Sequence, residues 1–221
     1  MANIFAERRR RVMQILRYLK KTYPNPKSEL KYSTSFQFLV AVILSAQYTD
    51  KKVNELTKTL FKKYKTVRDF ASANLGTFKK DISSVSFYNN KAKNIIATAK
   101  ILLKDFGGRV PKTLKELETL PGVGYKTANV VLGEIYDIWD GIAVDTHVRR
   151  LALKFNLCDS KNPDKIARCL EELIPKKDWK YVNNGLVLYG RYICTAREHD
   201  CKEHPLTKIY PRAANIWIKA K

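Results

Sequence analysis

The sequence lacks any apolar run that approaches the roughly 18 residues of a membrane-spanning helix. Cysteine is scarce, with four residues in 221, which is too few for the disulfide framework of a small secreted domain. The N-terminal segment is basic at Arg8–Arg11 but has no continuous apolar core, so it does not match a secretory signal. These absences exclude a membrane-spanning protein and a disulfide-stapled secreted one.

Acidic residues are also few. The chain has 42 Lys plus Arg against 21 Asp plus Glu, a formal net charge of +21. A polyanionic partner is therefore expected, either nucleic acid or an anionic membrane surface. The alternative is a generally basic protein of a lysine-rich proteome. With 45% hydrophobic residues the chain can still bury a proper core.

Helical periodicity dominates the sequence, and no series of alternating strands interrupts it. The pattern therefore predicts an all-α fold. Helix starts and stops are marked by capping residues, proline and glycine. The predicted signals are a cap at Thr34 or Ser35, a start at Asp50, capping boxes at Thr66 and Thr113, a helix over 89–106 stopped by Gly107-Gly108, and a start at Asn162-Pro163.

One turn has a pattern that suits an anionic ligand. Gly122 and Gly124 flank Val123 between two predicted helices, and such a turn can point several backbone N–H groups outward together. The following helix adds its positive N-terminal end, which suits a phosphate diester. Lys126 lies two residues after this turn, where its amine could meet a sugar carbon. The alternatives are an ordinary helix connection and a solvated lysine.

A second polar segment begins at Asp145, which follows a short apolar run and precedes a helical pattern. Its plain interpretation is a helix N-cap. An N-cap aspartate that faces a ligand can also be functional, because capping fixes its carboxylate. His147 allows the same two interpretations, structural or catalytic.

Taken together, these segments resemble the endonuclease III family of helix-hairpin-helix DNA glycosylases and abasic-site lyases. The resemblance covers nearly the whole chain, in order. The segments that match are 44–50 (LSAQYTD), 87–92 (FYNNKA), 107–111 (GGRVP), 120–129 (LPGVGYKTAN), 144–147 (VDTH) and 190–194 (GRYIC).

The resemblance implies an all-α protein of two helical lobes with the active site in a DNA cleft between them. Residues 27–139 would form a six-helix-barrel-type lobe that carries the hairpin. Residues 1–26 and 140–221 would form the second lobe from both termini. Lys126 would then come from one lobe and Asp145 from the other.

The family's chemistry gives these two residues roles. The amine of Lys126 would attack C1′ of the damaged nucleotide and form a Schiff base, and β-elimination would then cut the strand. Asp145 would stabilise the positive charge that develops on the sugar as the base departs, and would assist proton transfer. Related adenine-mismatch glycosylases lack this lysine, so Lys126 favours a bifunctional enzyme.

The resemblance also implies contacts with DNA. Gln47 would fill the space that the flipped base vacates. Phe87 stands where the family commonly has an intercalating leucine; the alternative is a core aromatic. Further contacts are expected from the hairpin and the GRYIC segment. These residues are Gly122, Val123, Gly124, Thr127 and Arg191.

The sequence departs from the family at its C-terminal C-x6-C-x2-C-x5-C loop, which holds a [4Fe–4S] cluster. Cys194 and Cys201 keep the first spacing, but His204 and Tyr210 stand at the other two positions. Four thiolates normally hold such a cluster, so no cluster and no metal are expected. Zinc on Cys194, Cys201 and His204 is the alternative, but it is disfavoured because no fourth ligand is evident. Cys158 and Cys169 are expected to be small buried side chains.

The sequence therefore predicts a monomeric base excision repair enzyme that removes damaged, oxidised pyrimidines from double-stranded DNA. No membrane association is expected, and a prokaryotic cytoplasm is the default location. Two alternatives stay open: a mismatch uracil or thymine glycosylase of the same fold, and a non-catalytic helix-hairpin-helix DNA-binding module.

Overall fold

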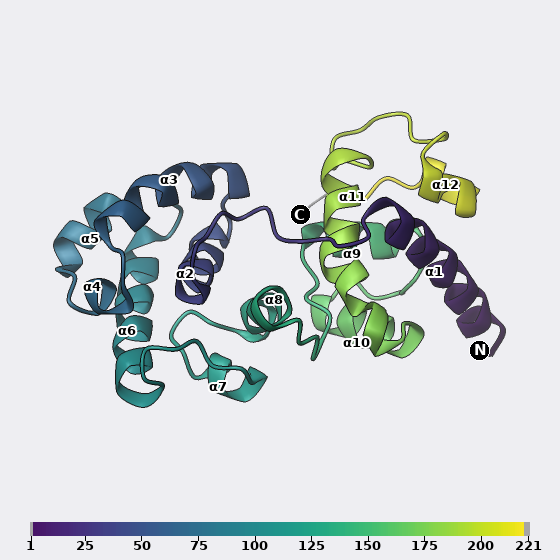
Figure 1. Cartoon of the computed structure of the whole chain (residues 1–221). Coiled ribbons are helices and arrows are strands. Elements are labelled where there is room, and N and C mark those ends of the chain that lie inside the picture. Colours follow the sequence, from purple (N-terminus) through teal and green to yellow (C-terminus); the bar gives the residue numbers. More distant parts are fainter. Residues whose placement is uncertain (1, 219–221) are drawn as a thin grey trace. The chain divides into compact units, whose positions relative to one another are not determined.

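The computed structural model describes residues 2–218, and over that range the chain is helical with no β-strand. The all-α fold class is confirmed. In the described residues no helix is both long and apolar enough to cross a membrane. The chain divides into two compact units (Figure 1). We call Glu29–Ile138 the central unit, and Met1–Ser28 with Trp139–Lys221 the terminal unit. The central unit thus spans residues 29–138, where the sequence resemblance implied a lobe of residues 27–139.

The central unit surrounds helix α2, which is apolar on all sides and is buried from Phe36 to Leu44. Its core includes a cluster of rings in which Phe70 contacts Phe36 and Phe78 edge to face. The helices of this unit are α2 (Ser35–Ser45), α3 (Asp50–Lys63), α4 (Val67–Ala71), α5 (Leu75–Asp81), α6 (Tyr88–Asp105), α7 (Leu114–Glu118) and α8 (Tyr125–Tyr136).

Local sequence signals set most of these helix ends. Thr34 caps α2, and Thr66 forms a full capping box with Asp69 at the start of α4. Thr113 caps α7 by accepting a hydrogen bond from the N–H of Glu116. The predicted caps at Thr34, Thr66 and Thr113 are confirmed, but the reciprocal capping box predicted at Thr113 is not formed, because the Glu116 carboxylate accepts from the Thr113 hydroxyl instead. The predicted helix over 89–106 is observed as Tyr88–Asp105.

The terminal unit joins the two ends of the chain. Its N-terminal helix α1 lies against α12 near the other end, as the purple and yellow ribbons of Figure 1 show. Leu16, Phe155 and Tyr189 are fully buried in its core. The helical segments are α1 (Ala2–Thr22), α9 (Thr146–Lys154), α10 (Pro163–Leu173), the 3-10 turn η1 (Lys176–Asp178), the π-helical segment η2 (Tyr181–Leu186), α11 (Val187–Tyr192), α12 (Pro205–Ile209) and the 3-10 turn η3 (Pro211–Asn215).

Two cysteines of the terminal unit correct a sequence-based expectation. Cys158 and Cys169 are not independent buried thiols but form a disulfide, with 6.2 Å between their Cα atoms. Their separation of 11 residues gave no hint of this pairing, because it depends on how α10 folds back beside the segment after α9. Cys194 and Cys201 are free and buried.

Candidate active site

The hairpin turn between α7 and α8 requires glycine at its first position. Gly122 has a φ of +81°, which L side chains rarely adopt. A Cβ atom there would lie only 2.9 Å from the side-chain amide of Asn94. The turn is closed by the N–H of Val123, which donates to the carbonyl of Leu120 at 3.0 Å. Gly122 is therefore needed for the fold of the turn itself.

Gly124 differs from Gly122 in its backbone angle and in the space around it. Its φ of −97° is open to any residue, and a Cβ atom placed there would meet nothing within 4 Å. It is the N-cap of α8 and supplies no side-chain capping hydrogen bond. The first N–H groups of a helix have no partner within the helix, so an anion can bind them. The open space at Gly124 gives a ligand close access to this backbone.

Lys126 is the second residue of α8, and its side chain is exposed. Thr127 follows it and is half-buried. Asn129 stabilises the first turn of α8, because its buried side-chain amide donates to the carbonyl of Tyr125 at 3.0 Å. The hairpin thus presents its lysine beside the open N-terminal turn of α8.

Asp145 lies in the terminal unit as the N-cap of α9, as its position predicted. Its Oδ1 accepts the N–H of Val148 at 2.8 Å. The capping bond holds one carboxylate oxygen and orients the second. The apolar run before it is fixed by Asn183 of η2, which accepts from the N–H of Ala143 and donates to the carbonyl of Gly141.

Helix α9 is tied to α11 by a buried guanidinium. Arg150 donates to the carbonyls of Gly190 at 2.9 Å and Thr195 at 3.1 Å. A Cβ atom on Gly190 would lie 3.0 Å from the side chain of His147, so close packing explains this glycine. These contacts hold the helix that carries Asp145 in a defined orientation.

His147 is a half-buried residue of α9 beside this junction. Burial lowers its pKa below the ordinary value for histidine. The Asp145 carboxylate opposes that effect, whereas the guanidinium groups of Arg191 and Arg150 add to it. Arg191 itself lies half-buried in the last turn of α11, next to the exposed ring of Tyr192.

Gln47 and Phe87 both project from turns of the central unit. Each has a positive φ, 56° and 57°, and each is exposed. Phe87 is 63% exposed, so the alternative of a core aromatic is excluded. A large apolar side chain on a strained backbone costs free energy, which suggests a functional reason for its position.

A buried lysine joins these two turns. The ammonium of Lys91, in the first turns of α6, donates to the carbonyls of Leu44 and Ala46 at 2.8 and 2.6 Å. Those carbonyls end α2 just before Gln47, while α6 begins just after Phe87. Lys91 therefore fixes both exposed residues on one rigid support. Its burial lowers the pKa of the ammonium.

Comparison with known proteins identifies the family of this chain. Residues 40–176 match the family described as "HhH-GPD superfamily base excision DNA repair protein". Endonuclease III of Synechocystis is 41% identical over 208 residues, which cover 94% of this chain and 95% of that protein. The chain belongs to the HhH-GPD superfamily.

Solved structures agree with this assignment. A non-covalent endonuclease III–DNA complex matches with a TM-score of 0.85 and 36% identity, covering 94% of this chain and 97% of that one. A trapped endonuclease III–DNA covalent intermediate gives the same values. The resemblance to endonuclease III is confirmed, and with it the prediction of a DNA glycosylase and lyase of base excision repair.

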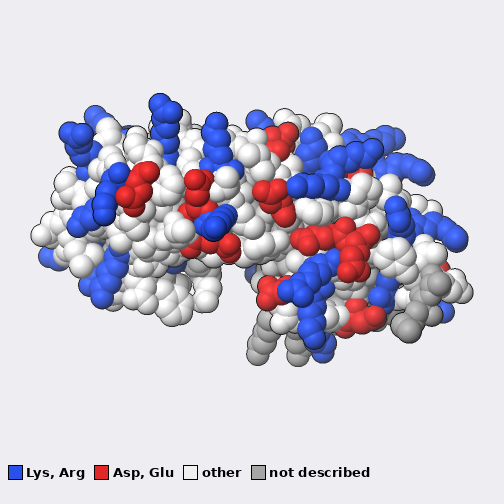
Figure 2. Space-filling view, turned by 90° about the horizontal axis from the view of Figure 1, so that it is seen from below, with Lys and Arg blue, Asp and Glu red and all other residues white. Residues whose placement is uncertain are grey.

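One face of this HhH-GPD protein carries charges of both signs. On the face shown in Figure 2, Lys and Arg side chains are spread widely and Asp and Glu side chains lie among them. The net charge of +21 gives a general attraction for DNA. A general attraction of this kind does not distinguish one nucleotide from another.

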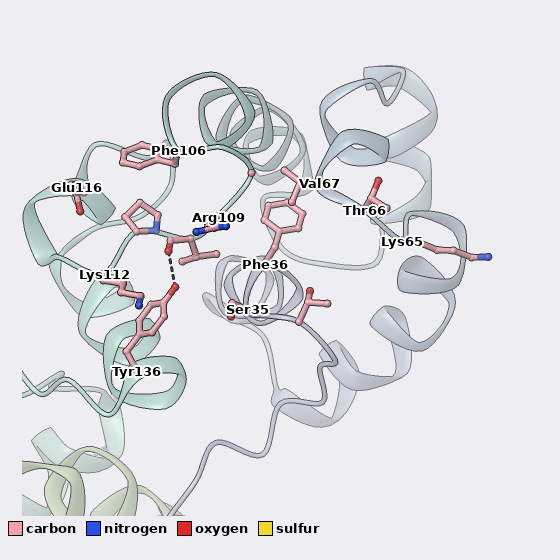
Figure 3. Close-up of a pocket in the computed structure, with 14 residues that line it drawn as sticks. Ser35, Phe36, Lys65, Thr66, Val67, Phe106, Arg109, Lys112, Glu116 and Tyr136 are labelled. Carbon is pink, nitrogen blue, oxygen red and sulfur yellow. Dashed lines mark hydrogen bonds between the residues drawn. The ribbon is translucent and has the colours of Figure 1, made fainter.

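The central unit also has a cavity of about 800 Å³ between the start of α2 and the segment after α6. Figure 3 shows Phe36, Arg109 and Tyr136 around it, with the Tyr136 hydroxyl donating to the carbonyl of Val110. None of the predicted catalytic or DNA-binding residues lines this cavity. It is separate from the hairpin site.

The loop for which the sequence resemblance implies a [4Fe–4S] cluster has a different donor set here. It offers the thiols of Cys194 and Cys201, while Cys158 and Cys169 are engaged in their disulfide. Tyr210, at the fourth ligand position, instead lies under the guanidinium of Arg11, 3.9 Å from its ring centroid. These residues do not fit a cluster that requires four thiolates.

Sequence reasoning did not find Lys91, Arg150 or Asn183, although each positions a predicted site residue. All three are polar residues buried by tertiary contacts, and in a sequence they look like surface residues. Lys91 lies in the matched segment 87–92, which is the one signal that could have drawn attention to it.

Proposed function

We propose that this protein is a bifunctional DNA glycosylase and abasic-site lyase that removes oxidised pyrimidines from duplex DNA, with Lys126 as its nucleophile. One observation carries the proposal: an exposed lysine in the first turn of α8, directly after a glycine turn whose backbone is open to a phosphate. A lyase of this kind needs an amine beside a bound DNA backbone.

The reaction follows from these groups. The Lys126 amine forms a bond to C1′ as the bond from C1′ to the base nitrogen breaks, and the base leaves with a proton. Opening of the sugar ring then gives a Schiff base on the same nitrogen. Loss of a C2′ proton expels the 3′ phosphate and cuts the strand. Water finally releases the lysine.

Asp145 supplies negative charge during base departure. Sugar C1′ becomes positively charged as its bond to the base breaks, and a fixed carboxylate lowers the energy of that state. The capping bond from Val148 holds the carboxylate in place before substrate binds. Asp145 is also suited to pass the proton between the amine and the departing base.

DNA binding divides between backbone and base contacts. The turn at Gly122 to Gly124 and Thr127 would hold phosphates, with Arg191 as a further cation. Flipping the base costs a few kcal/mol, and Gln47 and Phe87 would offset that cost by filling and stacking in the vacated space. We further propose that the enzyme acts as a monomer in a prokaryotic cytoplasm and carries no [4Fe–4S] cluster.

Strand cleavage tests the nucleophile. A duplex with one abasic site is incubated with the wild-type protein, with Lys126→Gln and with Lys104→Gln. Lys104 is an exposed lysine in the last turn of α6, so its variant is a control for the loss of one positive charge. The wild type and Lys104→Gln should cut the strand, and Lys126→Gln should not. Equal cutting by all three proteins would contradict the proposal.

A panel of lesions then tests the substrate class. Duplexes with thymine glycol, uracil, or a thymine mismatch are compared by the rate of base release. The proposal predicts that thymine glycol is excised fastest. Preferred excision of uracil or mismatched thymine would support the alternative enzyme class. Binding without base release or cutting would support a non-catalytic module.

A further inference from the structure

We propose that the loop between α11 and α12 binds one Zn²⁺ ion through Cys194, His199, Cys201 and His204. Three of these residues already converge. The Sγ atom of Cys194 and one ring nitrogen from each of His199 and His204 all lie within 4.8 Å of one another. The group belongs wholly to the terminal unit, so its geometry does not depend on the hairpin.

Unpartnered nitrogen atoms point to a missing ligand. The Nε2 of His199 and the Nδ1 of His204 are both buried, and neither has a hydrogen-bond partner among the described residues. A buried polar atom without a partner destabilises the folded state. Two such atoms beside a buried thiol are unfavourable together, unless a bound ion uses their lone pairs.

The orientation of His199 fits metal binding. Its Nδ1 lies 2.6 Å from the carbonyl oxygen of Arg197, so that nitrogen carries the proton and donates. The lone pair is therefore on Nε2, the buried atom without a partner. A hydrogen bond of this kind to the second ring nitrogen is typical of histidines that bind metals, because it fixes tautomer and ring direction.

The distances among Cys194, His199 and His204 allow these three ligands to close around an ion without refolding. Zinc lies about 2.3 Å from thiolate sulfur and about 2.0–2.1 Å from imidazole nitrogen, so ligand atoms of a tetrahedral site are about 3.3–3.8 Å apart. The ligand atoms of Cys194, His199 and His204 lie within 4.8 Å of one another, so they need to approach one another by roughly 1 Å. The rings of His199 and His204 are stacked with their centroids 5.1 Å apart.

Cys201 completes the site. It is buried in the same loop, and the N–H of His204 donates to its carbonyl at 3.1 Å in a tight turn. Two thiolates and two neutral imidazoles compensate the charge of Zn²⁺, so the nearby guanidinium of Arg150, 3.9 Å from the Cys194 sulfur, is not repelled. The sequence argument against zinc was the lack of a fourth ligand, and His199 removes it.

A metal here would fasten the end of the chain. Trp217 packs edge to face on His199 at 5.4 Å, and the buried Lys154 donates to the carbonyl of Ile216. The ion would thus connect α11, the loop and the C-terminal segment at one point. Its predicted role is structural, because closed four-ligand sites leave no position for substrate.

Metal content tests the proposal. Protein purified without chelator is analysed for zinc and iron, and its Co²⁺ form is examined for thiolate-to-cobalt absorption bands. We expect about one zinc per chain, tetrahedral cobalt bands, and a lower melting temperature after chelation. No bound zinc together with no cobalt bands would overturn the proposal. Stoichiometric iron with sulfide would overturn both this site and the proposed absence of a cluster.

Variants locate the ion. His199→Asn and Cys194→Ser should lower zinc content and remove or shift the cobalt bands, measured by metal analysis and absorbance. His147→Asn changes a histidine outside the loop and should retain one zinc. If His199→Asn keeps full zinc content with unchanged cobalt bands, the assignment is wrong. None of these readouts depends on enzyme activity, so the outcome is independent of the proposed lyase function.

Discussion

At the scale of single residues, Asp145 combines an observed structural role with a proposed chemical role, and one substitution can separate the two. Asparagine caps helices about as well as aspartate and can accept the same N–H of Val148. Asp145→Asn should therefore leave the free energy of unfolding within about 0.5 kcal/mol of wild type. Loss of the charge should lower the rate of base excision by roughly 100-fold or more. Urea denaturation and single-turnover kinetics measure the two effects. Unchanged excision would remove Asp145 from the mechanism.

Gly122 and Gly124 of the hairpin turn should respond differently to the same substitution by alanine. Gly122→Ala should destabilise the protein by about 1–3 kcal/mol, because its positive φ and its contact with Asn94 leave no room for a methyl group. Gly124→Ala should fold normally but bind DNA about tenfold or more weakly, because the methyl group obstructs phosphate approach. Thermal melting and DNA titration distinguish them. Equal DNA affinity of wild type and Gly124→Ala would contradict the phosphate-binding role.

His147 should make stability depend on pH. Its pKa is lower in the folded protein than the unfolded value of about 6.5, so the unfolded chain binds the proton more strongly. The contribution to stability is therefore complete above about pH 6.5 and is lost as pH falls below it, by at most about 1.4 kcal/mol per pH unit. Urea unfolding at several pH values should show a shallower decline for His147→Gln. Identical slopes for both proteins would contradict this effect.

At the scale of elements, Lys91 connects the C-terminal end of α2 to α6. Lys91→Met removes an ammonium from two helix-end carbonyls, which should cost about 2 kcal/mol of stability. It should also slow excision, because both Gln47 and Phe87 lose their support. Lys93→Met, an exposed lysine on the same helix, is the control and should change neither property.

Double mutants test whether Lys91 acts through Phe87. If it does, the effects of Lys91→Met and Phe87→Ala on the excision rate should be less than additive, since the second change removes a group already displaced. Strictly additive effects would mean that Lys91 does not act through Phe87.

The elements also show what sequence can and cannot predict. Caps at Thr34, Thr66 and Thr113 were predictable because each depends on three or four adjacent residues. The disulfide of Cys158 with Cys169 was not, because it depends on how α10 folds back beside the segment after α9. The clamp by Asn183 was not, because it joins η2 to a segment 40 residues earlier in the chain. His199 stands five residues after Cys194, and that spacing could have been noticed.

At the scale of the whole molecule, the charge and the site have separate tasks. A net charge of +21 provides salt-sensitive attraction to any DNA, and the basic side chains on the face in Figure 2 are widely spread. Recognition and reaction depend on few residues held by rigid helices. Family membership confirms the type of enzyme. The C-terminal loop has two free cysteines and two histidines in place of the four-cysteine motif that the sequence resemblance implied.

The account depends most on Lys126 as the nucleophile, and locating the covalent bond tests that directly. The protein is reacted with abasic-site DNA in the presence of borohydride, which reduces the Schiff base, and the trapped adduct is digested and mapped by peptide mass spectrometry. The account predicts a sugar remnant on the peptide that contains Lys126 and on no other lysine. An adduct on a different amine, or efficient trapping by Lys126→Gln, would contradict it.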